Sequence, residues 1–421
     1  MAPRLFRHRE AEERPAPTKR YHGCEPGERA TTKAMGRWVA LWLLTGIACG
    51  KSASQASVPP QHDAASAASV PATLPRKEVQ DIIASDRKIV SANGIEKLVA
   101  VRINGIEQWL SIRGRDRRNP ILLFLHGGPA SPTMPVDYTF QSPWEDYFTV
   151  VQWDQRGTGK TYASDPQGQG PLTIEQMTSD TAAIVQYLLK TYEKRKLFLL
   201  GHSWGSVLGV ALAQRHPEWL YAYVGVGQTI DMPKSEAEGY EFALAQARSQ
   251  HNIEAVKELE ALAPYPGALG ALTMQRIGVQ RKWVMYFGGL TWGRRNFSWD
   301  ANSWLLSPDY TGKELNAIGA GSQYSITRLL NPLQQFSYEA VTTFRCPIFL
   351  LEGRHDYAVS HTLAAQWFRR LHAPEKKLIW FDDAAHMVME EEPGRFLFHL
   401  LTDVRPIATK AGDAAPDEAV E

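Results

Sequence analysis

Residues 201–205 read Gly-His-Ser-Trp-Gly, so a serine stands between two glycines, each two positions away. The apolar run KLFLL precedes this segment, and the helix-forming run VLGVALAQRHP follows soon after it. This order predicts a strand, a tight turn and a helix, in which the two glycines avoid side-chain clashes within the turn. The Ser203 hydroxyl would then be held out at the turn, which suits a nucleophile that attacks a carbonyl carbon.

A second glycine-containing loop follows another apolar run. Residues 121–125 read ILLFL and lead into His126-Gly127-Gly128-Pro129-Ala130. Because glycines carry no side chain, backbone N–H groups in such a loop can face a substrate carbonyl oxygen. We expect the oxyanion to be bound by the N–H of Gly128 and by that of Trp204, the residue after the nucleophile. His126 is expected to brace the loop through hydrogen bonds.

A serine nucleophile needs a general base, and the base needs a carboxylate that orients it. When the serine lies on such a turn between a strand and a helix, the three groups follow along the chain in the order serine, acid, histidine. The predicted strand Ile348–Leu351 runs into EGRHD, which ends at Asp356, and the predicted strand Leu378–Phe381 runs into DDAAH, which ends at His386. We therefore predict Asp356 as the acid and His386 as the base for Ser203.

Other residues near these loops compete for the two roles. Glu352 lies at the end of its strand and stays an alternative acid. His355 is adjacent to the acid and precedes the final strand, so it is expected to be a poor base. His202 should point away from the site if Ser203 points into it, and Asp382 and Asp383 are expected to be solvated loop residues.

These loops require a rigid scaffold, and short apolar runs that alternate with helical patterns indicate an α/β fold with a largely parallel sheet between about residues 85 and 405. The first two strands form an edge hairpin through Asn104-Gly105. A helix is predicted over Ile174–Leu189, with Thr173 and Gln176 as its capping box. We predict eight strands: Lys97–Ile103, Gln108–Arg113, Ile121–Leu125, Thr149–Trp153, Leu197–Leu200, Ala222–Val226, Ile348–Leu351 and Leu378–Phe381.

The strand and helix alternation stops between residues 231 and 338, where aromatic residues are frequent and no convincing strand occurs. An insertion of this size after the sixth strand predicts a helical cap over the site. The core is then divided into residues 85–230 and 339–405. Residues 50–84 and 406–421 are poor in large apolar side chains, and they are predicted to be a flexible linker and a disordered tail.

The amino-terminal region, residues 1–49, has the pattern of a secretory signal that starts at Met35: one arginine, the apolar run Trp38–Ala48, then small and polar residues. This run is too short to span a hydrocarbon core of about 30 Å. Cys49 follows Gly-Ile-Ala and resembles the lipidated cysteine of bacterial lipoproteins, although plain cleavage after Ala48 stays open. We therefore expect an exported protein, periplasmic or held at a bacterial membrane by a lipid anchor.

The composition of the chain limits the kinds of partner and cofactor that we expect. The chain has 421 residues, 46 of them basic and 45 acidic, and the net charge of +1 argues against binding to nucleic acid. Three cysteines in different contexts support neither a disulfide framework nor a cysteine-based metal site. Acyl transfer through a serine, a histidine and a carboxylate requires neither a metal nor an organic cofactor, so we expect none. The oligomeric state does not follow from the sequence.

Five motifs together resemble the proline iminopeptidase family of α/β-hydrolases: HGGPA at 126–130, DQRGTG at 154–159, GHSWGS at 201–206, GRHD at 353–356 and AAH at 384–386. The resemblance covers roughly residues 85–230 and 340–402. It implies the α/β-hydrolase fold, a triad of Ser203, Asp356 and His386, and peptides or amides with a free N-terminal residue as substrates.

The cap departs from this resemblance. Related peptidases use cap glutamates for the substrate's α-ammonium group, whereas the tryptophan-rich stretch TWGRRNFSWDANSW contains none. Glu236, Glu238 and Glu241 in the first cap segment, or Asp300, could replace them, and Glu236, Glu241 and Asp300 are the first candidates. A carboxylesterase or lactonase with an aromatic cap pocket is therefore the alternative to an aminopeptidase, and a small peptide, amide or ester is the expected substrate.

Overall fold

The computed structural model describes residues 73–416. Its sheet has eight strands in the order β1-β2-β4-β3-β5-β6-β7-β8. β1 pairs antiparallel with β2, and β2 antiparallel with β4, while all other neighbours are parallel. The predicted fold class is therefore confirmed. The strands are β1 (Ile95–Ile103), β2 (Ile106–Gly114), β3 (Ile121–Leu125), β4 (Thr149–Asp154), β5 (Leu197–His202), β6 (Leu220–Val226), β7 (Ile348–Gly353) and β8 (Lys376–Phe381).

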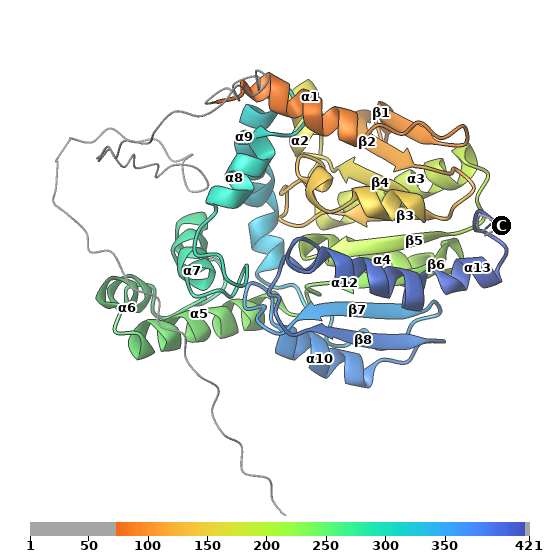
Figure 1. The fold of residues 1–421 in the computed structure, drawn as a ribbon. Coiled ribbons are helices and arrows are strands. Elements are labelled where there is room, and N and C mark those ends of the chain that lie inside the picture. The colour runs from red at the N-terminus through yellow and green to blue at the C-terminus, as the bar shows by residue number, and fades with distance from the viewer. Residues whose placement is uncertain (1–72, 417–421) are drawn as a thin grey trace, which may run out of the picture. The chain divides into compact units, whose positions relative to one another are not determined.

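The central strands are apolar throughout because helices cover both faces of the sheet (Figure 1). Leu123 and Leu199 face one hydrophobic core, and Phe124 and Leu200 face the other. Helices α3 (Ile174–Thr191), α4 (Trp204–Arg215) and α10 (His361–Arg370) pack into the first core. The second core is closed by α11 (Val388–Glu391), α12 (Pro393–His399), the π-helical turn Leu400–Val404 and α13 (Pro406–Lys410).

Two local predictions concern the turn between β1 and β2 and the first residues of α3. Asn104 and Gly105 have φ angles of 44° and 90°, and they join strands paired through Ile103 and Ile106, as an Asn-Gly hairpin turn requires. At the start of α3 the Thr173 hydroxyl accepts the N–H of Gln176. The Gln176 side chain instead donates to Asp180, so only half of the predicted capping box forms.

Five helices lie between β6 and β7 and form the predicted cap. They have a hydrophobic core of their own, which includes Tyr240, Leu244, Leu259 and Trp283. Figure 1 shows them gathered at one end of the sheet. The cap helices are α5 (Met232–Ser249), α6 (Ile253–Glu260), α7 (Met274–Tyr286), α8 (Ser298–Leu305) and α9 (Gly312–Leu333).

The prediction of a flexible linker over residues 50–84 is wrong for its last part. Helix α1 (Arg76–Asp86) forms there although none of its residues is buried. Polar contacts with the cap hold it: Gln80 donates to the carbonyl of Ser307 at 2.6 Å, and Arg87 to the Asp309 carboxylate at 3.2 Å. Apolar composition alone does not reveal an element that is anchored by hydrogen bonds.

The predicted disordered tail, residues 406–421, is also corrected. Its first residues form α13, whose Ala408 is buried in the second core. Asp413 then pairs with Lys194 and accepts the Tyr221 hydroxyl at 3.1 Å. The signal region with Cys49, the linker up to residue 72 and residues 417–421 lie outside the described part of the chain. From residue 73 to residue 416, no helix has the length and apolar character to cross a membrane.

Candidate active site

The segment around Ser203 forms the tight turn that its glycines predict. Ser203 joins β5 to α4 with φ 53° and ψ −119°, a conformation that side chains rarely adopt. A Cβ at Gly205 would lie 1.9 Å from the carbonyl oxygen of Leu125, and one at Gly201 would lie 2.7 Å from that of Gly205. Only glycine fits at either position, and the turn is held to β6 by the hydrogen bond from Ser203 N–H to Val226 O, 2.9 Å.

The structure brings the predicted acid and base together. Oδ2 of Asp356 lies 2.7 Å from Nδ1 of His386, and both side chains are buried. The second oxygen, Oδ1, accepts the N–H groups of Ala358 and Val359 at 3.0 and 2.9 Å. With both oxygens occupied, the carboxylate fixes the imidazole so that Nε2 faces away from it, as a base for a serine requires.

The acid and the base reach the serine turn at the carboxyl ends of the central strands. A Cβ at Gly227, which follows β6, would lie 2.7 Å from Nδ1 of His386 and 3.1 Å from Oδ2 of Asp356. The ring of His202, next to Ser203, is 4.7 Å from that of His386, and its Nε2 lies 3.0 Å from the His386 carbonyl oxygen. Among residues 73–416 no hydrogen bond joins the Ser203 hydroxyl to His386, whose Nδ1 lies against Asp356.

The competing acid and histidines have other contacts. Glu352 is fully buried, and Oε1 accepts the N–H of Gln228 at 3.1 Å, while burial beside Asp356 raises the pKa of its carboxyl well above the usual range. Its other oxygen, Oε2, has no hydrogen-bond partner within residues 73–416, so Glu352 does not hold His386. The ring of His355 stacks on that of Trp292 at 3.5 Å. His202 lies against His386, so the expectation that it points away from the site is wrong.

The loop predicted to bind the oxyanion lies against the serine turn. A Cβ at Gly127 would be 3.2 Å from Cβ of Ser203. Gly128 has a φ of 114°, which side chains disfavour. Trp204 is the first residue of α4, where the N–H group has no acceptor within the helix, so it can face a substrate oxygen.

His126 braces this loop in its neutral form. Its Nδ1–H donates to the carbonyl of Gly127 at 2.8 Å, and Nε2 accepts the N–H of Gln155 at 3.4 Å. Burial lowers the pKa of the imidazole to about 4. The Gln155 amide also bridges the His126 carbonyl and the Trp204 indole, which links the two loops.

A profile of the family described as "alpha/beta hydrolase fold" matches residues 120–393, well over half of the chain. The chain belongs to the alpha/beta hydrolase fold family. It is therefore a hydrolase, and its relatives show that it is similar to proline iminopeptidases.

Two of these relatives are similar in sequence and one in structure. This hydrolase is 31% identical over 297 residues to "Probable aminopeptidase YbaC" of Bacillus subtilis, a match that covers 70% of this chain and 92% of that one. It is 33% identical over 105 residues to the proline iminopeptidase of Arabidopsis thaliana, 25% of each chain. The proline iminopeptidase-related protein TTHA1809 of Thermus thermophilus superposes with a TM-score of 0.52 at 21% identity, over 74% of this chain and 99% of that one, which shows a shared fold.

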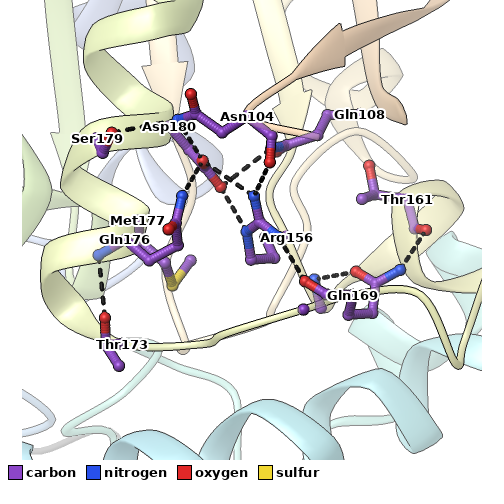
Figure 2. A network of polar contacts seen from close by, with 12 residues as sticks. Asn104, Gln108, Arg156, Thr161, Gln169, Thr173, Gln176, Met177, Ser179 and Asp180 are labelled. Atoms are coloured by element: carbon purple, nitrogen blue, oxygen red, sulfur yellow. Dashed lines mark hydrogen bonds and ion pairs between the residues drawn. The ribbon is translucent and has the colours of Figure 1, made fainter. Parts of the chain in front are cut away.

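The hydrolase holds its DQRGTG loop through a buried ionic network (Figure 2). Arg156 donates to both oxygens of Asp180 on α3, at 2.6 and 3.1 Å. Arg156 also contacts the carbonyl of Gln169, whose side chain accepts the N–H of Gly157 at 2.8 Å. Sequence reasoning identified this loop only as a family marker. The sequence signal that could have revealed the network is Arg156 itself. It stands between buried elements, and a buried guanidinium needs a carboxylate partner.

The structure does not gather the three cap carboxylates that the sequence singled out. Glu236 is buried and already occupied: Nη2 of Arg281 lies 2.6 Å from one oxygen, and the Tyr265 hydroxyl donates to the other at 2.5 Å. Glu241 is exposed. Asp300 is partly buried, which raises the pKa of its carboxyl, and Oδ1 lies 3.9 Å from Nη1 of Arg294.

Glu390, which sequence reasoning missed, lies beside Asp300. It shares Arg294, whose Nη2 is 3.4 Å from Oε2 of Glu390, and burial raises the pKa of the Glu390 carboxyl to about 8. Oδ2 of Asp300 is buried and has no hydrogen-bond partner within residues 73–416. Of the three candidates, Asp300 is the one with a buried oxygen that has no hydrogen-bond partner in the described chain.

Proposed function

We propose that this hydrolase is an aminopeptidase of the proline iminopeptidase type, which releases N-terminal residues from peptides or amides through an acyl-enzyme on Ser203. The observation that carries this proposal is the Asp356–His386 pair, 2.7 Å apart and buried at the loops that meet the serine turn. The similarity over 92% of a protein named as an aminopeptidase supports the substrate class.

The reaction follows from the arrangement of the three groups. Nε2 of His386 takes the Ser203 proton as the hydroxyl oxygen bonds to the substrate carbonyl carbon. Negative charge then develops on the carbonyl oxygen, which the N–H groups of Gly128 and Trp204 stabilise. The imidazolium, oriented by Asp356, gives its proton to the departing amine. Water, activated by the same imidazole, hydrolyses the acyl-enzyme and regenerates the serine.

A free N-terminus must also be recognised, because a buried ammonium group without a counter-charge is costly. Glu236 is neutralised by Arg281, and Glu241 is exposed. Asp300 has an oxygen without a hydrogen-bond partner in the described chain. We therefore assign the ammonium contact to Asp300 in preference to the other two.

Three matched substrates test this function: an aminoacyl arylamide, its N-acetylated counterpart and an acyl ester of similar size. The proposal predicts that kcat/KM is highest for the free-amine arylamide, with proline among the residues released. Ser203→Ala is the control for contaminating peptidases. A preference for the N-acetylated compound or the ester would decide for the carboxylesterase or lactonase, and would mean that the aromatic cap receives an apolar acyl group.

We also propose that the protein is exported and held at a bacterial membrane by a lipid on Cys49. The support is the sequence pattern alone, since residues 1–72 lie outside the described structure. Mass spectrometry of the mature N-terminus from membrane fractions tests it. The predicted result is a lipidated Cys49, and retention of residues 1–48 would contradict export.

A further inference from the structure

One carboxylate accepts hydrogen bonds from both sides of the proposed base. Oε2 of Glu391, in α11, accepts the N–H of Ala385 at 3.1 Å and that of Met387 at 3.0 Å. These two residues flank His386. The other oxygen, Oε1, accepts the N–H of Trp292, which belongs to the cap. A single side chain thus joins the backbone of the base loop to the backbone of the cap.

The part of the cap that Glu391 contacts is Gly289–Trp292, here called the cap strap. Its carbonyl groups accept hydrogen bonds from the residues around the acid and the base. The carbonyl of Gly289 accepts the N–H groups of Tyr357 and Ala358, at 2.8 and 3.1 Å, just after Asp356. The carbonyl of Leu290 accepts the N–H of His386 itself at 3.0 Å.

We propose that Glu391 is a positioning residue: it fixes the backbone on both sides of His386 and couples the base to the cap strap. This inference rests on the proposed role of His386 as the base for Ser203. Glu391 does not contact substrate in this account. It acts by orienting the imidazole, while the cap strap holds the backbone that follows Asp356 through the carbonyl of Gly289.

The chemistry of the side chain makes the proposal specific. A carboxylate offers two acceptor oxygens to three N–H donors, and hydrogen bonds to an ionised acceptor are the stronger kind. Glutamine offers one acceptor oxygen, and its NH₂ group would meet a backbone N–H group instead of accepting from it. Displacement of a catalytic group by about 1 Å can lower a rate by about 100-fold.

The test compares Glu391→Gln with Glu392→Gln, the next residue, whose carboxylate contacts the Arg395 side chain at 3.2 Å. Assays are run at pH 8, because burial raises the pKa of the Glu391 carboxyl to about 7. We expect kcat of Glu391→Gln to fall about 10- to 100-fold with KM changed less than about threefold. Labelling of Ser203 by a fluorophosphonate should slow by a similar factor. Glu392→Gln should keep wild-type rates.

Amide hydrogen exchange supplies a readout that a merely local structural role would not move. In Glu391→Gln we expect faster exchange both at Ala385 and Met387 and at Trp292, which lies 99 positions from Glu391. Should the variant fail to fold, the wild-type protein still decides, because the proposal requires all three amides to be protected from exchange. Unprotected amides would overturn it.

Two results separate this inference from the proposed function. If the wild-type protein is labelled at Ser203 and Glu391→Gln is labelled equally fast, the positioning role is overturned and the proposed nucleophile stands. If the wild-type protein is not labelled at Ser203 at all, the proposed function fails and the inference fails with it. A rise in KM with kcat unchanged would also overturn the positioning role, since that pattern indicates the loss of a substrate contact.

Discussion

The catalytic loops and the cap of this hydrolase differ in how their charged groups are satisfied. In the loops, Asp356 accepts two backbone N–H groups and holds His386, so its charge is directed at one neighbour. In the cap, Glu236 is paired with Arg281 and Tyr265 inside the cap itself. A buried carboxylate can therefore orient a reacting group or merely hold two helices together. The partners of the carboxylate distinguish the two cases: a histidine ring at Asp356 and a guanidinium at Glu236.

The largest effect is expected at the nucleophile. Ser203→Ala should lower kcat by about five to six orders of magnitude, because every later step requires the serine oxygen. Steady-state rates on the preferred substrate measure this, with circular dichroism as the control for folding. The small side chain of Ser203 is only partly buried and contributes little packing, so the melting temperature should stay close to that of the wild type. Substantial hydrolysis by pure Ser203→Ala would remove the proposed mechanism.

The acid offers a matched pair of carboxyl groups. Asp356→Asn should lower kcat by about four orders of magnitude, since an amide cannot stabilise the imidazolium or hold the correct tautomer. Glu352→Gln is the control, because Glu352 accepts the N–H of Gln228 and burial raises the pKa of its carboxyl. Its kcat should stay within a few-fold of the wild-type value. The reverse order of the two variants would make Glu352 the acid.

The same contrast predicts a structural effect in the cap. Glu236→Gln leaves the partly buried guanidinium of Arg281 without its counter-charge, so we expect the free energy of unfolding to fall by about 3 kcal/mol. Urea denaturation measures this change. kcat/KM of the protein that remains folded should be nearly unaltered for all three substrate types. A selective rise of KM for free-amine substrates would instead show that Glu236 binds the ammonium group.

The buried carboxyl of Glu390 should make the free energy of unfolding depend on pH. Burial raises the pKa of its carboxyl from about 4.5 to about 8, so the folded state binds the proton more tightly than the unfolded state. Its stabilising contribution is complete below about pH 4.5 and is lost as the pH rises through 8. In Glu390→Gln the decrease in unfolding free energy between pH 5 and pH 8 should be smaller by about 3 kcal/mol. Identical pH profiles for the two proteins would contradict the assigned pKa.

The smallest effect concerns substrate selection. Asp300→Asn should raise KM about tenfold for aminoacyl arylamides, equivalent to about 1.4 kcal/mol, because the ammonium group loses its counter-charge. KM for the N-acetylated compound should not change, and kcat should stay similar for both. An equal rise in KM for both substrates would indicate general damage to the cap and would withdraw Asp300 as the ammonium partner.

Local pattern predicted the parts of the molecule whose geometry is set by neighbouring residues. Apolar β-rich runs located all eight strands, and the signal is strongest for β3 to β7, which are buried on both faces. The glycines around Ser203 predicted a turn in which a Cβ would approach a backbone oxygen to 1.9 Å. Chain order along a parallel sheet was enough to select Asp356 and His386, which the structure pairs.

Long-range polar pairing could not be predicted in the same way. Helix α1 and the segment after Pro406 are poor in apolar residues, yet hydrogen bonds to Ser307 and Asn119 hold them in place. Glu391 lies five residues after His386 in a run of three glutamates, and nothing in the run marks the one that binds the base loop. These contacts depend on where distant backbone groups lie, which a single sequence does not show.

The most direct test of the account is to locate the residue that a fluorophosphonate modifies. The wild-type protein is treated with the reagent, digested, and mapped by mass spectrometry, alongside Ser203→Ala and Asp356→Asn. The account predicts one modified residue, Ser203, with no labelling of Ser203→Ala and strongly slowed labelling of Asp356→Asn. Modification of another residue, or undiminished labelling of Ser203→Ala, would contradict the assignment of Ser203 as the nucleophile.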